Sequence, residues 1–269
     1  MELHQLPIEQ LLPPTIAAAI DAGRAIMDIY THPDTDWQVE RKADNSPLTL
    51  ADRRSHQVIA RALAHTPYPL LSEEGIHTPY NERKNWQTLW IVDPLDGTKE
   101  FLKRNDEFTV NIALVHCGVP VMGVIYIPAK HTLYWGCEGQ GAFTAPVCPT
   151  DFTVGQAQPL PLAHEDTRPF RVVASRSHLS PETQSFIDNL CRTHGQVETV
   201  SAGSSLKLCL VAEGKADVYP RMAPTMEWDT AAGHAIARAA GCTVTHAETG
   251  EPLQYNKEDL HNPYFVVAR

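Results

Sequence analysis

Residues 90–98 read Trp-Ile-Val-Asp-Pro-Leu-Asp-Gly-Thr, and the chemistry of the chain converges on this stretch. Trp90, Ile91 and Val92 have the aromatic and β-branched composition of a buried strand. Pro94 cannot continue a sheet ladder, so we expect it to end that strand, and Gly97-Thr98 has the form of a turn that leads into a helix. A strand end, two acids and a helix start in close succession are typical of a functional site.

Asp93 and Asp96 lie three residues apart across this turn, so both carboxylates can face one point. There they would repel each other strongly unless a cation lay between them. Mg²⁺ suits this place because it binds carboxylate and carbonyl oxygens, and the N–H groups after Gly97 can hold a phosphate. The alternative is an ordinary Asp-Pro-x-Asp-Gly surface turn, since these residue types are common in turns. On these residues alone the two interpretations are about equal.

The composition indicates a folded globular protein without a basic surface for nucleic acid. With 269 residues, 43% of them apolar and 20% charged, the chain can bury the core of one large domain or two moderate ones. It carries 22 basic and 32 acidic residues, a net charge of −10. This balance argues against a protein bound mainly through nucleic-acid phosphates, so an anionic ligand would need metal ions to mediate its binding.

Several features concern the location of the protein. The six cysteines form no C-x-x-C pair, which fits a reducing, cytoplasmic setting, and residues 1–5 do not have the form of a signal peptide. Residues 108–129 carry no charge, but the Cys117-Gly118-Val119-Pro120 breaker divides them into a buried hairpin rather than a membrane span. Peripheral association with the inner membrane is left open, although no lipidation signal or basic amphipathic helix argues for it.

The first half of the chain has the patterns of an α+β unit. Helices are predicted over residues 15–30, with Pro13-Pro14 marking the start, and from residues 48–52 through Ala64. Strands are predicted over residues 70–72, 109–116, 121–127, 132–135 and 142–143. Residues 145–169 are rich in proline and polar residues and predict a connection, so we place a boundary near residue 160 between halves 1–160 and 161–269.

The second half alternates between strands and helices, which favours an α/β layer. Strands are predicted over residues 170–174, 197–200, 216–219, 242–246 and 264–268, and helices over residues 181–194, 205–213 and 230–240.

Further acids lie where these elements start or stop. Asp52 falls near a helix start, where the helix dipole favours a carboxylate for purely structural reasons, and Asp229 taken by itself is interpreted as the N-cap of its helix. Glu73 and Glu74 follow the strand over residues 70–72. Because neighbours in an extended segment point in opposite directions, at most one of them should face a shared site, and the resemblance described next favours Glu73.

Four segments together resemble the inositol monophosphatase superfamily of Mg²⁺-dependent, lithium-sensitive phosphatases, and the match spans most of the chain. They are Leu48-Thr49-Leu50-Ala51-Asp52, Ser72-Glu73-Glu74, Asp93-Pro94-Leu95-Asp96-Gly97-Thr98 and Trp228-Asp229-Thr230-Ala231-Ala232-Gly233. Within the superfamily, residues 42–47, 96–101, 108–114 and 203–207 look like the bacterial CysQ-type 3′(2′),5′-bisphosphate nucleotidases. Inositol phosphatases typically read D-G-T-T-N-F where this chain has D-G-T-K-E-F.

The resemblance implies a fold and an activity. The fold would be the layered αβαβα sandwich of this sugar-phosphatase type, combining α+β and α/β parts. The activity would be removal of the 3′-phosphate from adenosine 3′,5′-bisphosphate (PAP), giving AMP, with the sulfated precursor PAPS as a further substrate, in sulfur assimilation and PAP recycling. An inositol or sugar phosphate monoesterase of the same fold is one alternative. A catalytically silent, metal-dependent anion-binding regulatory protein is an alternative from another class.

The resemblance also implies a metal site of two or three Mg²⁺ ions. It assigns Glu73, Asp93 and the Leu95 carbonyl to one ion, and Asp93, Asp96 and Asp229 to a second. A third ion would touch Glu73 and the substrate phosphate, with Lys42 supporting the phosphate or its waters. Two such ions can clamp the attacking and the leaving oxygen of an in-line displacement.

The remaining implied roles concern catalysis and substrate. Thr98, hydrogen-bonded to Asp52, would orient and deprotonate the attacking water, with Glu73 as the third catalytic residue. The substrate-binding residues would be Glu73, Leu95, Asp96, Gly97, Thr98 and Asp229 around the phosphate, and Ser204, Lys207, Arg221 and His178 around the nucleotide. The expected partner is this small nucleotide alone, bound by a monomer or a homodimer.

Overall fold

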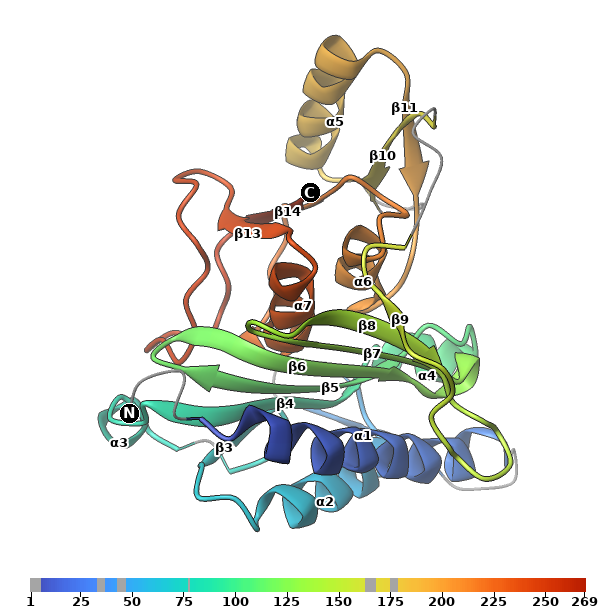
Figure 1. Ribbon diagram of the computed structural model, residues 1–269, viewed down its shortest axis with the longest axis vertical. Coiled ribbons are helices and arrows are strands. Elements are labelled where there is room, and N and C mark those ends of the chain that lie inside the picture. Colours follow the sequence, from blue (N-terminus) through green and yellow to red (C-terminus); the bar gives the residue numbers. More distant parts are fainter. Residues whose placement is uncertain (1–5, 33–36, 43–46, 77, 163–167, 175–178) are drawn as a thin grey trace.

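The structure is a computed structural model, and it describes residues 6–32, 37–42, 47–76, 78–162, 168–174 and 179–269. Its elements stack in five layers, which Figure 1 shows from bottom to top: two helices, a large sheet, two helices, a smaller sheet and an outer helix. The predicted αβαβα sandwich is therefore confirmed.

The large sheet has seven strands in the order β3-β4-β5-β6-β7-β8-β9. Only β3 and β4 are parallel, and the other neighbours are antiparallel. Helices cover both faces, which explains why the central strands are apolar without alternation. The strands are β3 (Leu70–Ser72), β4 (Thr88–Asp96), β5 (Thr109–His116), β6 (Val119–Ile127), β7 (Thr132–Cys137), β8 (Gly141–Pro146) and β9 (Gln158–Pro159).

The sequence predicted that strand β4 ends at Pro94. In the structure it continues to Asp96. Its register against β5 shifts between Asp93 and Asp96. At such an irregularity the ladder does not require a donor from every residue, so a proline is tolerated there. The shift also turns the end of the strand, which carries both acids.

The helices α1 (Ile8–Tyr30) and α2 (Leu50–Leu63) cover one face of the large sheet (Figure 1). The predicted start of α1 at Pro13-Pro14 is wrong, because the helix begins at Ile8 and both prolines lie inside it. Leu6, Ile8 and Leu11 are buried in the core, and this packing holds a turn that lacks two backbone donors.

The opposite face of the large sheet is covered by α6 (Leu206–Ala212) and α7 (Glu227–Ala239). Above them lies a five-stranded sheet in the order β11-β10-β12-β14-β13, and α5 (Pro181–His194) packs on its far side (Figure 1). Its strands are β10 (Phe170–Val173), β11 (Val197–Val200), β12 (Val218–Arg221), β13 (Thr243–His246) and β14 (Phe265–Ala268). The smaller elements are β1 (Glu40–Arg41), β2 (Pro47–Leu48), α3 (Tyr80–Arg83), α4 (Thr98–Lys103) and a 3₁₀ turn over Pro128–Lys130.

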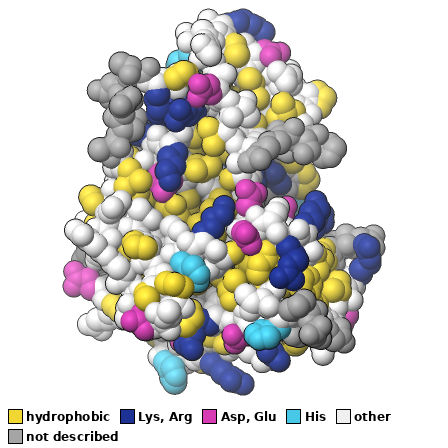
Figure 2. Space-filling view, turned by 90° about the vertical axis from the view of Figure 1, so that its right-hand side faces the viewer, with side chains coloured by type: hydrophobic (Ala, Val, Ile, Leu, Met, Phe, Trp, Pro, Cys, Tyr) yellow, Lys and Arg dark blue, Asp and Glu magenta, His cyan; other side chains and the backbone are white. Residues whose placement is uncertain are grey.

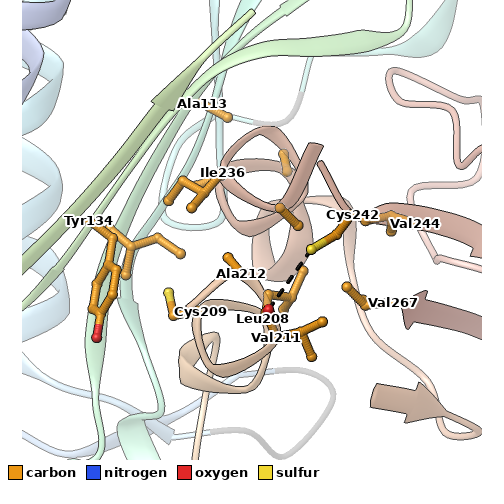
Figure 3. Packing of buried hydrophobic residues seen from close by; sticks show 14 of the residues in the cluster. Ala113, Tyr134, Leu208, Cys209, Val211, Ala212, Ile236, Cys242, Val244 and Val267 are labelled. Atoms are coloured by element: carbon orange, nitrogen blue, oxygen red, sulfur yellow. Dashed lines mark hydrogen bonds between the residues drawn. The ribbon is translucent and has the colours of Figure 1, made fainter. Parts of the chain in front are cut away.

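One hydrophobic core joins the two sheets through α6 and α7. Figure 3 shows Leu208, Ala212 and Ile236 between Ala113 of the large sheet and Val267 of the small one. The predicted boundary near residue 160 falls between β9 and β10, but this core contains residues from both sides of it. The division into two domains stays a prediction.

Helix α7 lies very close to the large sheet. A Cβ atom on Gly123 of β6 would clash with the Ala232 carbonyl, and one on Gly136 of β7 would come within 2.8 Å of the Ile236 Cα atom. The backbones therefore touch directly, which only glycine at these two positions allows.

The uncharged residues 108–129 form mainly the β5–β6 hairpin, as predicted. No helix in the described part of the chain is both long and apolar enough to cross a membrane.

Candidate active site

The site is built around the turn from β4 into α4. Gly97 has a φ of +95°, and a Cβ atom there would clash with Ser204 Oγ, so the turn requires glycine. Helix α4 then starts at Thr98, as predicted from the sequence. The turn brings the Asp93 and Asp96 side chains, the Leu95 carbonyl and the Thr98 hydroxyl into one small region.

Asp93 lies at the centre of the acidic group and is 2% exposed. The Leu95 N–H donates to its Oδ1 at 3.0 Å. Burial raises the pKa of Asp93 well above its ordinary range, and the neighbouring charges of Glu73, Asp96 and Asp229 raise it further. A carboxylate in this position needs either a proton or a cation.

Asp229 reaches the site from the opposite half of the chain. It is not the N-cap of its helix but the third residue of α7, and its Oδ2 accepts a hydrogen bond of 2.8 Å from the Met226 N–H. Burial, followed by the charge of Asp96, raises the pKa of Asp229 to about 8. The same carboxylate therefore caps the helix and belongs to the acidic group.

Glu73 and Glu74 both face Lys42. The Lys42 ammonium donates to Glu73 Oε1 at 2.6 Å and also to Glu74 Oε1. The expectation that the two acids point in opposite directions is wrong, because they lie in a turn after β3 rather than in an extended segment. The choice of Glu73 as the metal ligand stays a prediction. Burial raises the pKa of Glu73 even though Lys42 opposes this.

Asp52 is 2% exposed in the first turn of α2. Its Oδ2 accepts hydrogen bonds from the backbone and hydroxyl of Thr49, so Asp52 takes part in capping its own helix, in addition to the dipole effect expected from the sequence. Its Oδ1 accepts a hydrogen bond of 3.0 Å from the Thr98 hydroxyl, as the resemblance implies. Burial raises the pKa of Asp52, and these hydrogen bonds oppose the shift.

The second half of the chain adds cations to the same place. Ser204, Lys207 and Arg221 line a cavity of about 240 Å³ together with Asp96, Gly97 and Asp229. Burial lowers the pKa of Lys207, and the charge of Arg221 contributes to this, so an anion bound here would reverse the shift. Arg221 Nε is buried and has no hydrogen-bond partner among the described residues. His178 lies outside the described residues.

The cavity continues into a second hollow of about 520 Å³, which also touches Lys207 and Arg221. Its other lining residues are Glu100, Lys103, Asn105, Glu107, Ser201, Ala202, Gly203 and Ser204. The Ser204 hydroxyl is engaged with the backbone carbonyls of Asp96 and Glu107, at 3.0 and 2.8 Å. Lys207 and Arg221 thus separate the acidic group from a larger open space.

Two buried polar residues of the site were not predicted as functional. Ser205 and Asn111 hydrogen-bond to each other at 2.8 Å, and both approach Asp96 Oδ2. Asn111 lies within residues 108–114, one of the segments that carry the resemblance, and it is an amide inside an otherwise uncharged strand. Ser205 lies at a predicted helix start within residues 203–207, another of those segments, but neither residue was assigned a role.

The donor set fits a hard divalent cation. Glu73, Asp93, Asp96, Asp229 and the Leu95 carbonyl offer only oxygen atoms, the ligands that Mg²⁺ prefers. Among the described residues, no three His, Cys, Asp or Glu side chains form a group that could hold an ion as they lie. Lys42, the Met226 N–H and Ser205 donate hydrogen bonds to some of the carboxylate oxygens. Burial and mutual repulsion still favour a cation here.

A family model described as the inositol monophosphatase family matches residues 8–268. The chain belongs to the inositol monophosphatase family. Members of this family depend on metal ions, typically Mg²⁺.

Within the inositol monophosphatase family, the chain is similar to proteins named CysQ. It is 47% identical over 255 residues to the 3′(2′),5′-bisphosphate nucleotidase CysQ of Escherichia coli K12, covering 93% of this chain and 96% of that protein. It matches the crystal structure of CysQ from Bacteroides thetaiotaomicron with a TM-score of 0.89 and 56% identity over 98% of both chains. The extragenic suppressor protein suhB of Bartonella henselae matches with a TM-score of 0.72 and 27% identity, over 97% of this chain and 94% of that one.

Proposed function

We infer that this chain is a 3′(2′),5′-bisphosphate nucleotidase, a metal-dependent hydrolase that converts PAP to AMP and phosphate in sulfur metabolism. The observation that carries this inference is the cavity in which the acidic group and two cations, Lys207 and Arg221, lie side by side. A substrate with two phosphates needs both features. The similarity to CysQ proteins along nearly the whole chain supports the same conclusion.

For the metal site, we propose the ligands that the family resemblance assigns. Glu73, Asp93 and the Leu95 carbonyl would hold one ion, and Asp93, Asp96 and Asp229 a second. A third ion would lie near Glu73, where Lys42 now neutralises the carboxylate. When bound, Mg²⁺ supplies Lewis-acid stabilisation of the phosphoryl oxygens and of the leaving group.

The residues of the chain itself would orient the attacking water. Because the Thr98 hydroxyl donates its hydrogen to Asp52, the lone pairs of Thr98 Oγ1 remain able to accept a hydrogen from water. The raised pKa of Asp52 makes this carboxylate a better final acceptor for the proton. Glu73, the third proposed catalytic residue, would complete the negative surroundings of the water.

The two phosphates of the substrate would bind in separate regions of the cavity. The N–H groups of Gly97 and Thr98 would hold the reacting 3′-phosphate, next to Glu73, Leu95, Asp96 and Asp229. Lys207 and Arg221 would hold the second phosphate, since buried cations bind phosphate strongly once water is excluded. The hollow beyond them would take the remainder of the nucleotide, and it leaves room for the larger PAPS.

Location and assembly stay predictions. We propose a cytoplasmic protein, and a monomer or homodimer that binds only the small nucleotide. On the part of the surface drawn in Figure 2, basic and acidic side chains are interspersed, without the continuous basic stripe that nucleic-acid binding requires.

The decisive experiment compares phosphate release from PAP, PAPS and inositol 1-phosphate, first with Mg²⁺ and then with EDTA. We expect strong, Mg²⁺-dependent preference for the nucleotides. A preference for inositol phosphate would instead indicate a monoesterase with the same metal site. Binding of Mg²⁺ and PAP without release of phosphate would indicate a regulatory protein.

A further inference from the structure

Ser205 lies between two of the proposed metal ligands. Its N–H donates to Asp96 Oδ2 at 2.7 Å, and its hydroxyl oxygen lies 2.6 Å from the same carboxylate oxygen. The hydroxyl is also 2.7 Å from the backbone carbonyl of Asp229. One side chain, 2% exposed, thus joins an acid of the first half of the chain to an acid-bearing turn of the second.

Asn111 on β5 holds Ser205 in place. Its Nδ2 donates to Ser205 Oγ at 2.8 Å, and its Oδ1 accepts a hydrogen bond of 2.9 Å from Thr109. Because Ser205 Oγ accepts from Asn111, its single hydrogen points to the remaining acceptors, Asp96 or the Asp229 carbonyl. The three hydrogen-bonded residues Thr109, Asn111 and Ser205 are almost fully buried, which strengthens their hydrogen bonds.

The donors gather on one oxygen of Asp96. Oδ2 accepts from the Ser205 N–H and lies 2.6 Å from the Ser205 hydroxyl oxygen, with Asn111 Nδ2 at 3.4 Å. Within the described part of the chain, no hydrogen bond reaches Asp96 Oδ1. Asp229 has the same arrangement, with the Met226 N–H on Oδ2. Each acid is therefore fixed through one oxygen, and its other oxygen is left for a cation.

We propose that Ser205, supported by Asn111, is a positioning residue of the active site that orients Asp96 and holds it in register with Asp229 for metal binding. The inference rests on the proposed function, because the orientation of the two acids matters to catalysis only if they bind metal. Residues that hydrogen-bond to metal ligands typically change metal affinity by about 10- to 100-fold when they are removed. A merely structural polar contact would change stability and leave metal affinity unchanged.

The test measures Mg²⁺ binding to the metal-free protein by calorimetry, for the parent and for Ser205→Ala. Alanine keeps the N–H that bonds to Asp96, so the substitution removes only the hydroxyl. We expect Mg²⁺ to bind about 10- to 100-fold more weakly. In turnover, the Mg²⁺ concentration for half-maximal rate should rise, while KM for PAP at saturating Mg²⁺ stays close to that of the parent.

The matched control is Thr15→Ala in α1, far from the site. Thr15 is 1% exposed, and its hydroxyl donates to the Leu11 carbonyl at 2.7 Å. This variant loses a buried hydrogen bond of the same kind, so its melting temperature should fall while its Mg²⁺ affinity stays unchanged. Ser205→Cys, which keeps the size of the side chain but is a weak donor, replaces Ser205→Ala if the alanine variant does not fold.

A double-mutant cycle with Asn111→Leu tests the route from Asn111 through Ser205. Asn111→Leu alone should weaken Mg²⁺ binding less than Ser205→Ala does, and it should add little to the double variant. Mg²⁺ affinity within twofold of the parent in Ser205→Ala would overturn the inference and leave the proposed function standing. A parent protein that binds no Mg²⁺ would overturn both.

Discussion

The Thr98 hydroxyl donates a hydrogen bond of 3.0 Å to Asp52 Oδ1 and so joins the first residue of α4 to the first turn of α2. The other oxygen of Asp52 is held by Thr49. The carboxylate cannot turn away from Thr98 without breaking the cap of its own helix. The helix-capping motif therefore also fixes the side chain of Asp52, which we propose accepts the proton of the attacking water.

Thr98→Ala should lower kcat about 100-fold, because it removes the group that orients and deprotonates the water. Mg²⁺ affinity should change much less, since the ligand set is intact, and calorimetry beside steady-state kinetics separates the two quantities. Thr98→Ser keeps the hydroxyl and is the matched control, for which we expect most of the activity. Equal losses of kcat and of Mg²⁺ affinity would place Thr98 with the metal ligands instead.

Asp93→Asn should abolish turnover, by about 1,000-fold or more, without unfolding the protein. Because burial and four neighbouring acids disfavour the Asp93 charge, the metal-free variant should melt at the same temperature as the parent or higher. The rise in melting temperature that Mg²⁺ gives the parent should disappear. Asp151→Asn, on an exposed loop, makes the same chemical change as a control. Retained activity would remove Asp93 from the proposed metal site.

Lys207→Gln should raise KM for PAP by about 10- to 100-fold, the usual effect of losing a charge-assisted contact to phosphate. Hydrolysis of a small monophosphate without a second phosphate should stay nearly unchanged, because it does not need this cation. Lys130→Gln, at an exposed turn, serves as the control for a general change in charge. If the variant hydrolysed both substrates equally poorly, Lys207 would act on the acidic group rather than on the second phosphate.

His234 should make the protein less stable in acid. It is 2% exposed, and burial lowers its pKa to about 3, while the unfolded chain has the ordinary value of about 6.5. Between these values the unfolded state binds the extra proton, so the free energy of unfolding falls as the pH drops below about 6.5. At pH 5 this single group contributes a loss of about 2 kcal/mol. Melting temperatures of the parent and of His234→Gln between pH 7.5 and 5 test this, and the variant should show the smaller decline.

Metal removal gives a further prediction at the proposed second ion site. EDTA should stop phosphate release, and added Mg²⁺ should restore it. From the family resemblance we expect Li⁺ to inhibit, in competition with the ion held by Asp93, Asp96 and Asp229. Rates measured against Li⁺ at several Mg²⁺ concentrations decide the matter. An enzyme indifferent to Li⁺ would contradict the assignment of this second site.

The family, the layered fold and most strands and helices could be predicted from the sequence, since periodicity and compact motifs encode them locally. The errors have physical reasons. The two prolines of α1 were taken for a boundary, but burial of Leu6, Ile8 and Leu11 extends the helix beyond them. Likewise, Pro94 does not end β4, because the register shift beside it removes the need for its missing donor.

The contacts among the site residues were harder to predict from the sequence, because they join segments far apart in the chain. Ser205 and Asp96, for example, are 109 residues apart, and no local pattern indicates their hydrogen bonds. The pairing of Lys42 with both Glu73 and Glu74 also depends on a turn that the strand pattern did not reveal. The metal ligands and the nucleotide contacts stay proposals drawn from the resemblance and from this geometry.

The close approach of α7 to Gly123 and Gly136 makes two remote positions relevant to catalysis. The helix that rests on these glycines begins with the turn that carries Asp229. A methyl group at either position would push the helix away from the sheet, and its first turn, with Asp229, would move with it. Substitutions there would therefore lower catalytic activity as well as stability, although neither glycine lies among the residues that line the active-site cavity.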